Sequence, residues 1–391
     1  MLRSLYSGIS GLRSHQEMLD VTGNNIANVN TAGFKSSTTV FQDTLSQMTQ
    51  GAGGPETGVG GTNPAQVGLG VQVAGVSTNF SQGSAQATGK ATDLMISGDG
   101  FFVTRLGNDT VYTRAGSFDF DADGRLVTPD GKIVQGYSAT NGVVNDGGAL
   151  GDITLPVAAA APAIATTSAT LAGNLPSDAA VGTALTREAD VYDASGAQHE
   201  LTLQYTRTAA GWDVAGSDGQ GNTASGTVTF GADGTIASGA TLTVGGITAD
   251  MTQLTGFAAL STASIVSQDG REAGTLQGFA LSKDGTLVGS FSNGTSLALG
   301  RIALATFTNP AGLEKTGASG YRSTANSGEA TVGIPGSAGV GSLAAGTLEM
   351  SNVDLSQEFT NLIVAQRGFQ ANARIITTSD EVLQELTNLK R

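Results

Sequence analysis

Cysteine is absent from the 391 residues, so disulfides, zinc–thiolate sites and cysteine nucleophiles are excluded together. Charged residues are scarce at 13%, which is about half the share of a typical soluble domain. Aromatic residues contribute only 5%. Deep ligand pockets are usually lined with large side chains, so this composition disfavours one. The chain instead holds 57 glycines, which suit tight turns, strands and closely packed subunits.

Positive charge is also in short supply. The formal net charge is −14 and no cluster of lysine and arginine occurs, so we expect no nucleic-acid partner. No apolar stretch approaches the roughly 20 residues of a membrane span, and we expect no membrane insertion. Polar residues interrupt the first 19 residues, which therefore lack the continuous apolar core of a cleaved signal peptide. Any export should follow another route.

Both ends of the chain predict amphipathic helices, because apolar residues recur there at spacings of four and three. Each stripe lies on one side of its helix and cannot be buried by that helix alone. We expect the two helices to pair with each other or with neighbouring copies, and packing onto the central region is the alternative. The stripes run through Leu5, Ile9, Leu12, Leu19 and Ile26, and through Leu355, Phe359, Leu362, Gln366, Phe369, Ile376 and Leu383.

The middle of the chain predicts β structure. Asp-Gly pairs recur between apolar runs, a strong hairpin signal, for example at Asp123 and Asp284. Trp212 is expected to anchor a core. The predicted fold is mainly β with terminal α-helices: the helices form a coiled-coil domain, and nested β-barrel or sandwich-like domains lie between them. The expected parts are a helical domain (1–30 plus 350–391), Gly-rich connecting segments (31–70 plus 326–349), a first β domain (71–156 plus 276–325) and an inserted second β domain (157–275).

Motifs that could carry chemistry are weak. Asp119, Asp121, Asp123 and Asp130 have the spacing of a calcium loop, but position twelve is not Glu and the flanks predict strands, so a hairpin turn is favoured over calcium binding. The two histidines form no H-E-x-x-H motif, and neither a G-x-S-x-G nor a G-x-G-x-x-G motif occurs. We predict no enzyme activity, no cofactor and no metal.

The most informative string is NNIANVNTAGFK at 24–35. Asparagine competes with the helix backbone for hydrogen bonds, so several at a helix end call for an explanation. They form either a polar contact surface or a plain helix end that leads into a loop. Spacing alone leaves both readings open.

This string resembles the N-terminal signature of the axial proteins of the bacterial flagellum, the rod, hook and hook-junction subunits. The segments 98–103 and 112–137 are similar to the first β domain of that family, and 346–389 is similar to its C-terminal helix. The inserted region 157–275 resembles the hook branch, because distal-rod members are shorter and lack such an insert.

The resemblance implies a structural subunit that polymerises with itself into a flexible curved tube, a universal joint that transmits torque from rod to filament. It also implies contact with rod, hook-junction and hook-cap proteins, passage through the type III export apparatus, and an extracellular location without a cleaved signal peptide. A distal-rod subunit is one alternative. An extracellular β-rich adhesin or glycan-active protein is another.

We assign self-assembly to the apolar stripes and to residues in the two family signatures. In the N-terminal signature these are Asn24, Asn25, Asn28, Gly33 and Phe34, and in its C-terminal counterpart they are Gln366, Phe369, Gln370 and Asn372.

Overall fold

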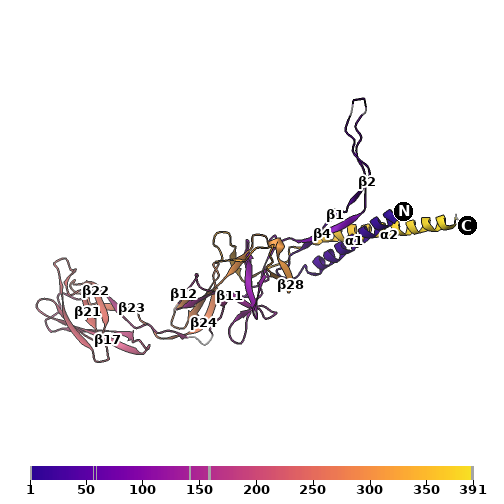
Figure 1. Ribbon diagram of the computed structural model, residues 1–391. Helices are drawn as coiled ribbons and strands as arrows, with labels where there is room; N and C mark the ends of the chain where they lie inside the picture. The colour runs from indigo at the N-terminus through magenta and orange to yellow at the C-terminus, as the bar shows by residue number, and fades with distance from the viewer. Residues whose placement is uncertain (1, 56, 59, 141, 157–159, 389–391) are drawn as a thin grey trace. The chain divides into compact units, whose positions relative to one another are not determined.

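The computed structural model describes residues 2–388, apart from 56, 59, 141 and 157–159. The expected domain limits at residues 1, 157 and 391 therefore lie outside the described residues. The chain forms two compact units (Figure 1). Unit 1 contains Met1–Leu155, Ala280–Val288 and Ala298–Arg391, and unit 2 contains Pro156–Phe279 and Gly289–Leu297.

The two ends of the chain form the predicted helices, and the helices pack against each other in unit 1. Helix α1 spans Leu2–Ala27 and helix α2 spans Leu355–Asn388. The carboxylate of Asp354 caps α2 by accepting hydrogen bonds from the amides of Ser356 (2.8 Å) and Gln357 (3.3 Å). No helix among the described residues is both long and apolar enough to cross a membrane.

In unit 1, strands from both sides of the insert share one open sheet, in the order β26-β11-β7-β8-β29-β28. Aromatic side chains such as Phe101, Tyr112 and Tyr321 are buried in its core. The elements of this unit are β1 (Ser37–Asp43), β2 (Ser46–Gln50), β3 (Ala65–Gly68), β4 (Val71–Thr78), β5 (Ala85–Ala87), β6 (Leu94–Ser97), β7 (Phe101–Leu106), β8 (Asp109–Thr113), β9 (Asp119–Phe120), β10 (Leu126–Val127), β11 (Ile133–Thr140), β12 (Val143–Val144), β13 (Gly151–Asp152), β27 (Leu304–Thr306), the 3₁₀ helix η1 (Pro310–Gly312), β28 (Glu314–Gly317), β29 (Gly320–Arg322), β30 (Thr331–Gly333), β31 (Ser342–Ala345) and β32 (Thr347–Glu349).

Three strands contribute residues to both units: β24 (Gly274–Leu281), β25 (Thr286–Phe291) and β26 (Ser296–Ile302). The Asp284-Gly285 pair forms the turn between β24 and β25, and the Asp123-Gly124 pair forms the turn between β9 and β10. Both glycines have positive φ, 79° and 76°. The hairpin prediction is confirmed at these two positions because only glycine adopts that backbone readily.

Unit 2 is a sandwich of two open sheets. One sheet has the order β16-β17-β18-β19-β20, and the other has the order β21-β22-β15-β23 with a parallel β15–β22 pair. Trp212 and Tyr205 are fully buried in the core between them, so the prediction for Trp212 is confirmed. The strands of this unit are β14 (Ala160–Ala161), β15 (Ser168–Asn174), β16 (Ala184–Tyr192), β17 (Gln198–Arg207), β18 (Trp212–Ser217), β19 (Thr223–Phe230), β20 (Ile236–Ser238), β21 (Thr241–Val244), β22 (Ile247–Thr255) and β23 (Ser264–Gln268).

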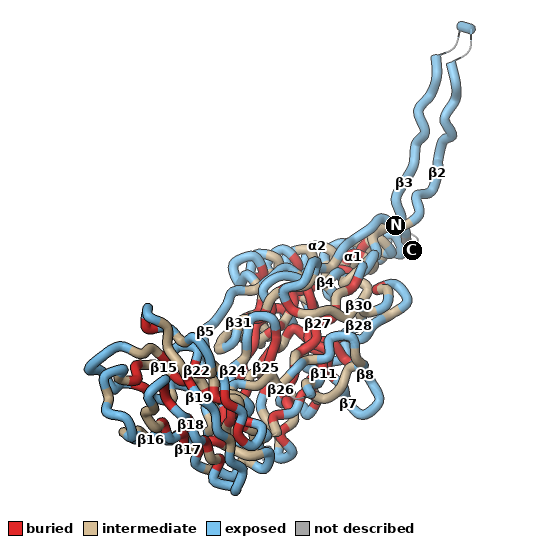
Figure 2. The backbone as a smooth tube through the Cα atoms, turned by 90° about the vertical axis from the view of Figure 1, so that its left-hand side faces the viewer, coloured by how far each residue is buried: buried red, intermediate tan, exposed pale blue. Residues whose placement is uncertain are grey.

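The predicted fold class, mainly β with paired terminal helices, is confirmed, but its barrel option is not: no sheet among the described residues closes on itself. The sheets of unit 2 bury their inner faces against each other, so closure is not needed to form a core. The segment 31–70, which we expected to be a Gly-rich connection, contains strands. Within it β2 pairs with β3 in a hairpin whose strand residues are exposed throughout (Figure 2). The first strand of the segment, β1, pairs with β4, which follows the segment.

Candidate self-assembly surface

The contact between α1 and α2 is made largely by small side chains. Gly8, Gly11 and Ser14 are buried on α1, and Ala365 is buried on α2. A Cβ atom at Gly11 would lie 2.8 Å from the side chain of Asn372, a distance too short for a normal contact. Glycine therefore allows the two helices to approach closely.

The predicted apolar stripe of α1 lies beside this contact rather than in it. Its members are all half-buried: Leu5, Ile9, Leu12, Leu19 and Ile26. Strand β4 covers part of the same helix, where the amide of Val71 donates to Ser10 Oγ over 3.2 Å. The stripe is thus only partly covered within the chain.

The stripe of α2 divides into two groups. Leu362, Phe369, Asn372, Ile376 and Leu383 are half-buried, whereas Leu355, Phe359, Gln366 and Gln370 are exposed. Five further apolar side chains that the spacing did not single out are also exposed, by 41–57%: Ile363, Val364, Ile375, Val382 and Leu386. Two apolar patches of α2 are therefore open to solvent, because Leu355, Phe359 and Ile363 lie on one side of the helix and the other exposed apolar residues lie on a second side. Such surfaces mark interaction sites.

Asn25, one of the signature asparagines, has partners within the chain. It is 1% exposed, its Nδ2 donates to the carbonyl of Ser37 (2.7 Å) and to Glu358 Oε1 (3.1 Å), and its Oδ1 accepts from the amide of Ser37 (3.0 Å). This amide joins the end of α1 to the start of β1 and to the first turn of α2. The asparagine is therefore tolerated in the helix, because both its amide nitrogen and its amide oxygen have partners within the chain.

Gly33 is also determined by contacts within the chain. Its φ is 68°, and a Cβ atom there would lie 2.4 Å from the amide nitrogen of Ala115. Its own amide donates to the carbonyl of Glu349 over 2.8 Å. Any larger residue would be strained at this position and would clash with the backbone that follows β8.

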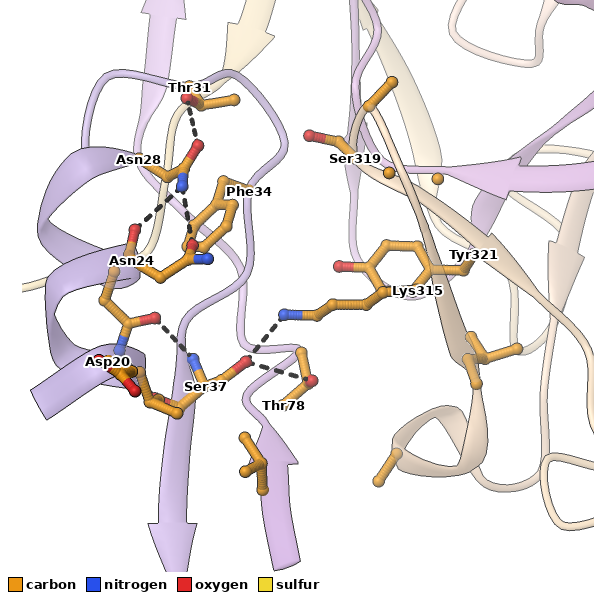
Figure 3. Close-up of a pocket in the computed structure, with 18 of the residues that line it drawn as sticks. Asp20, Asn24, Asn28, Thr31, Phe34, Ser37, Thr78, Lys315, Ser319 and Tyr321 are labelled. Carbon is orange, nitrogen blue, oxygen red and sulfur yellow. Dashed lines mark hydrogen bonds between the residues drawn. The ribbon is translucent and has the colours of Figure 1, made fainter. Parts of the chain in front are cut away.

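The remaining residues of the N-terminal signature line a pocket of about 680 Å³ in unit 1 (Figure 3). Asn24, Asn28 and Phe34 contribute to one side, and Lys315 and Tyr321 lie across from them. Asn28 Nδ2 donates to the carbonyl of Asn24 over 2.9 Å, which closes the helix end. Lys315 Nζ donates to Ser37 Oγ (2.8 Å) and lies 5.4 Å from the ring centroid of Phe34, and burial lowers the pKa of Lys315.

Next to this pocket lies a buried ion cluster that residue spacing does not predict. Lys35 Nζ lies 2.7 Å from Glu349 Oε1, and Arg114 Nη1 lies 3.5 Å from Glu349 Oε2, with all three side chains at most 3% exposed. Burial lowers the pKa of Lys35, although its hydrogen bond to Glu349 acts in the opposite direction. One feature of the sequence could have indicated Lys35: it is a charged residue at the end of the asparagine-rich string, in a chain with only 13% charged residues.

The carboxylates of the possible calcium loop are each held by a cation. Lys90 Nζ lies 3.0 Å from Asp119, Arg125 binds both Asp121 and Asp123, and Lys132 binds Asp130. The hydrogen bond from Lys90 lowers the pKa of Asp119. No group of residues suited to a metal ion occurs among the described part of the chain. The donor set fits a cation-paired hairpin turn rather than a calcium site.

Family models for flagellar axial proteins match along the chain. Residues 5–35 match flagella basal body rod protein, and residues 95–169 match the flagellar hook protein FlgE/F/G D1 domain. Residues 160–332 match the flagellar basal body protein FlaE D2 domain, and residues 344–389 match the flagellar basal body rod FlgEFG protein C-terminal model.

Full-length relatives agree with these models. The chain is 41% identical to flagellar hook protein FlgE of Borreliella burgdorferi over 445 aligned positions, which cover 100% of both chains. It is 36% identical to the FlgE of Salmonella typhimurium over 99% of this chain and 100% of that one. It is also 36% identical to flagellar basal-body rod protein FlgG of Bacillus subtilis over 100% of both. The chain therefore belongs to the flagellar hook protein family, whose members are structural subunits of the bacterial flagellum.

Proposed function

We propose that this hook subunit polymerises through α1 and α2 into a curved tube that bends while it transmits torque from rod to filament. The exposed apolar surface of α2 carries the proposal. Phe359 and Ile363 lie on one side of α2 and are exposed by 50% and 57%, although they belong to a helix that already has an intrachain partner. A second copy that covers this surface would gain about 25 cal/mol for each Å² of apolar area removed from water.

The self-assembly residues of this proposal are the two stripes together with the exposed signature residues. Asn24, Asn28, Gln366 and Gln370 are open to solvent or line the pocket, so a neighbouring copy can reach them. The helical domain 1–30 plus 350–391 is the proposed polymerisation domain. Asn25 and Gly33 serve it indirectly, because they hold α1 against the sheet and α2.

We also assign the other partners by family. The rod and hook-junction proteins, the hook cap and the type III export apparatus are the proposed partners. The proposed location is extracellular, in the flagellum, reached without a cleaved signal peptide. A helix pair with an uncovered apolar surface suits such a route, because it becomes fully stable only when a neighbour covers it.

Removal of both helices tests the polymerisation. We expect a variant that lacks residues 2–27 and 355–388 to stay folded and monomeric, because it keeps both cores and the Lys35–Glu349 pair. The full chain should form curved tubes in negative-stain images. Phe369→Asp should prevent tubes and leave the cores of both units folded. Tubes from the truncated variant would refute the mechanism, and straight tubes from the full chain would favour the distal-rod alternative.

A further inference from the structure

Each terminal helix carries charges on the side that faces away from the α1–α2 contact. Arg374 lies nine residues, about two and a half turns, from the buried Ala365, so it points away from α1, and Glu381 lies seven residues further on. On α1, Asp20 lies nine residues and Arg13 two residues from the buried Gly11, and at about 100° per residue both point to the opposite side of the helix. All four side chains are exposed.

These charges have no ionic partners within the described part of the chain. Neighbours along a helix surface lie three or four residues apart. Arg374 has Gln370 and Thr378 at those positions, so no carboxylate is in reach. Glu381 has Glu385 four residues on, a like charge that destabilises an isolated helix slightly. On α1, Arg13 has Glu17 four residues on, a position from which a carboxylate can pair with it, but the structure shows no ion pair between these two described residues.

The contact between α1 and α2 fixes how far along the pair each charge lies. Gly8 lies against Ile375 and Gly11 against Asn372, so the helices are antiparallel and each step along α1 matches an equal step back along α2. By the same register, Arg13 lies level with Gln370 and Asp20 lies level with Ile363. Arg374 is eleven positions beyond Ile363, and Glu381 is eleven positions beyond Gln370.

We propose that the outer face of α2 in one copy docks against the outer face of α1 in a second copy, in the same orientation and displaced by about eleven residues, or roughly 16 Å, along the helices. This single displacement places Arg374 opposite Asp20 and Glu381 opposite Arg13. The two ion pairs have opposite polarity, so together they define the register. The inference rests on the proposed polymerisation and names its partner surface, a second copy of this chain.

Other displacements lose these pairs. With no displacement, Arg374 faces the level of Ile9, and Glu381 faces the first residues of α1. With a displacement of one helical turn, about four residues, Arg374 comes opposite Arg13, and the two like charges repel. The charge pattern therefore favours one register and disfavours its near neighbour, as charged residues at helix interfaces do elsewhere.

Charge reversal in the full chain tests the register. Arg374→Asp and Asp20→Arg should each raise the critical concentration for tube formation roughly fivefold at low salt, and the double variant should return it close to the wild-type value. Arg13→Glu, Glu381→Arg and their double variant should behave in the same way. Arg367→Asp is the matched control: it lies one heptad before Arg374 on the same face, so Asp20→Arg should not rescue it.

The outcomes separate this inference from the proposed function. Rescue by both double variants, without rescue of Arg367→Asp, supports the register. The register is wrong if the wild-type chain forms tubes normally but each double variant has a critical concentration as high as that of its more impaired single variant. That result would leave the proposed polymerisation intact. If the wild-type chain forms no tubes, or if the chain without its helices forms them, the proposed polymerisation itself is wrong. Far-UV circular dichroism of each monomer confirms that the variants are folded.

Discussion

Replacement of Lys35 by methionine should destabilise unit 1 far more than the loss of an ordinary surface ion pair. The ammonium of Lys35 donates to the carbonyl of Ser81 and to Glu349 Oε1, each over 2.7 Å. Methionine has a similar length but no charge and no donor. The variant therefore leaves the Glu349 carboxylate buried, with the amide of Gly83 (2.9 Å) and a longer contact to Arg114 (3.5 Å) as its remaining partners.

The size of the effect follows from burial. Lys35 and Glu349 have side chains that are 0% exposed, so water cannot replace the lost partner. Removal of one member of a buried ion pair typically costs about 3–5 kcal/mol, because the other charge is left uncompensated. At a urea dependence of about 3 kcal/mol/M, the unfolding midpoint of unit 1 should fall by about 1–1.7 M.

The molecule offers an internal control for this measurement. Its single tryptophan, Trp212, is buried in unit 2, so tryptophan fluorescence reports the unfolding of that unit. Unit 1 is followed by hydrogen exchange of the amides in β32 and β5, which pair beside Glu349. Lys35→Met should move the exchange transition and leave the fluorescence transition in place. Arg322→Met, which breaks the exposed 3.0 Å pair with Asp109, should cost less than about 1 kcal/mol.

One result would refute this reasoning. If Lys35→Met costs no more than Arg322→Met, the cluster is not electrostatically isolated from water. A coupling near zero in the Lys35–Glu349 double-mutant cycle would lead to the same conclusion, because residues in direct contact should be non-additive.

Two more predictions concern the backbone and a turn. Gly33→Ala should lower the stability of unit 1 by more than about 1 kcal/mol, because φ is 68° and Ala115 blocks the new Cβ. Gly51→Ala is the control, because its Cβ would meet no atom within 4 Å and it should not lower the stability. Thermal unfolding of the two variants measures the difference. Hydrogen bonds from the Ser195 hydroxyl and the Ala197 amide lower the pKa of Asp193 to about 2. The stabilisation from ionised Asp193 is thus complete above about pH 4 and disappears as the pH falls through about 2. Asp193→Asn should remove this part of the acid dependence, as measured by Trp212 fluorescence between pH 2 and 5.

The local features of the fold followed from the sequence. Asp-Gly pairs predicted the turns at Asp123 and Asp284, because a hairpin needs positive φ and glycine supplies it. The isolated Trp212 predicted a core, because so large a side chain seldom stays exposed. Both features can be read from a short stretch of sequence, because neither depends on a residue far away in the chain.

The buried polar network could not be predicted in this way. Lys35 and Glu349 are more than 300 positions apart, as are Asn25 and Glu358, and no periodicity connects such residues. Sequence reasoning identified Asn25 as unusual but assigned it to contact between copies. The structure accounts for it by hydrogen bonds within one copy, because a buried amide needs partners wherever the fold supplies them.

The difference between the predicted and observed helix contacts has a physical cause that supports assembly. Periodicity marks large apolar residues, and close approach of two helices instead needs small ones such as Gly8, Gly11 and Ala365. Once these small residues form the contact, the large side chains move to its flanks and outer face. A helix pair that served only its own chain would bury Phe359 and Ile363, which here keep 50% and 57% of their surface in water. The close contact between α1 and α2 therefore forms one stable helical pair. The apolar area that this contact leaves uncovered is the area that a second copy can bury.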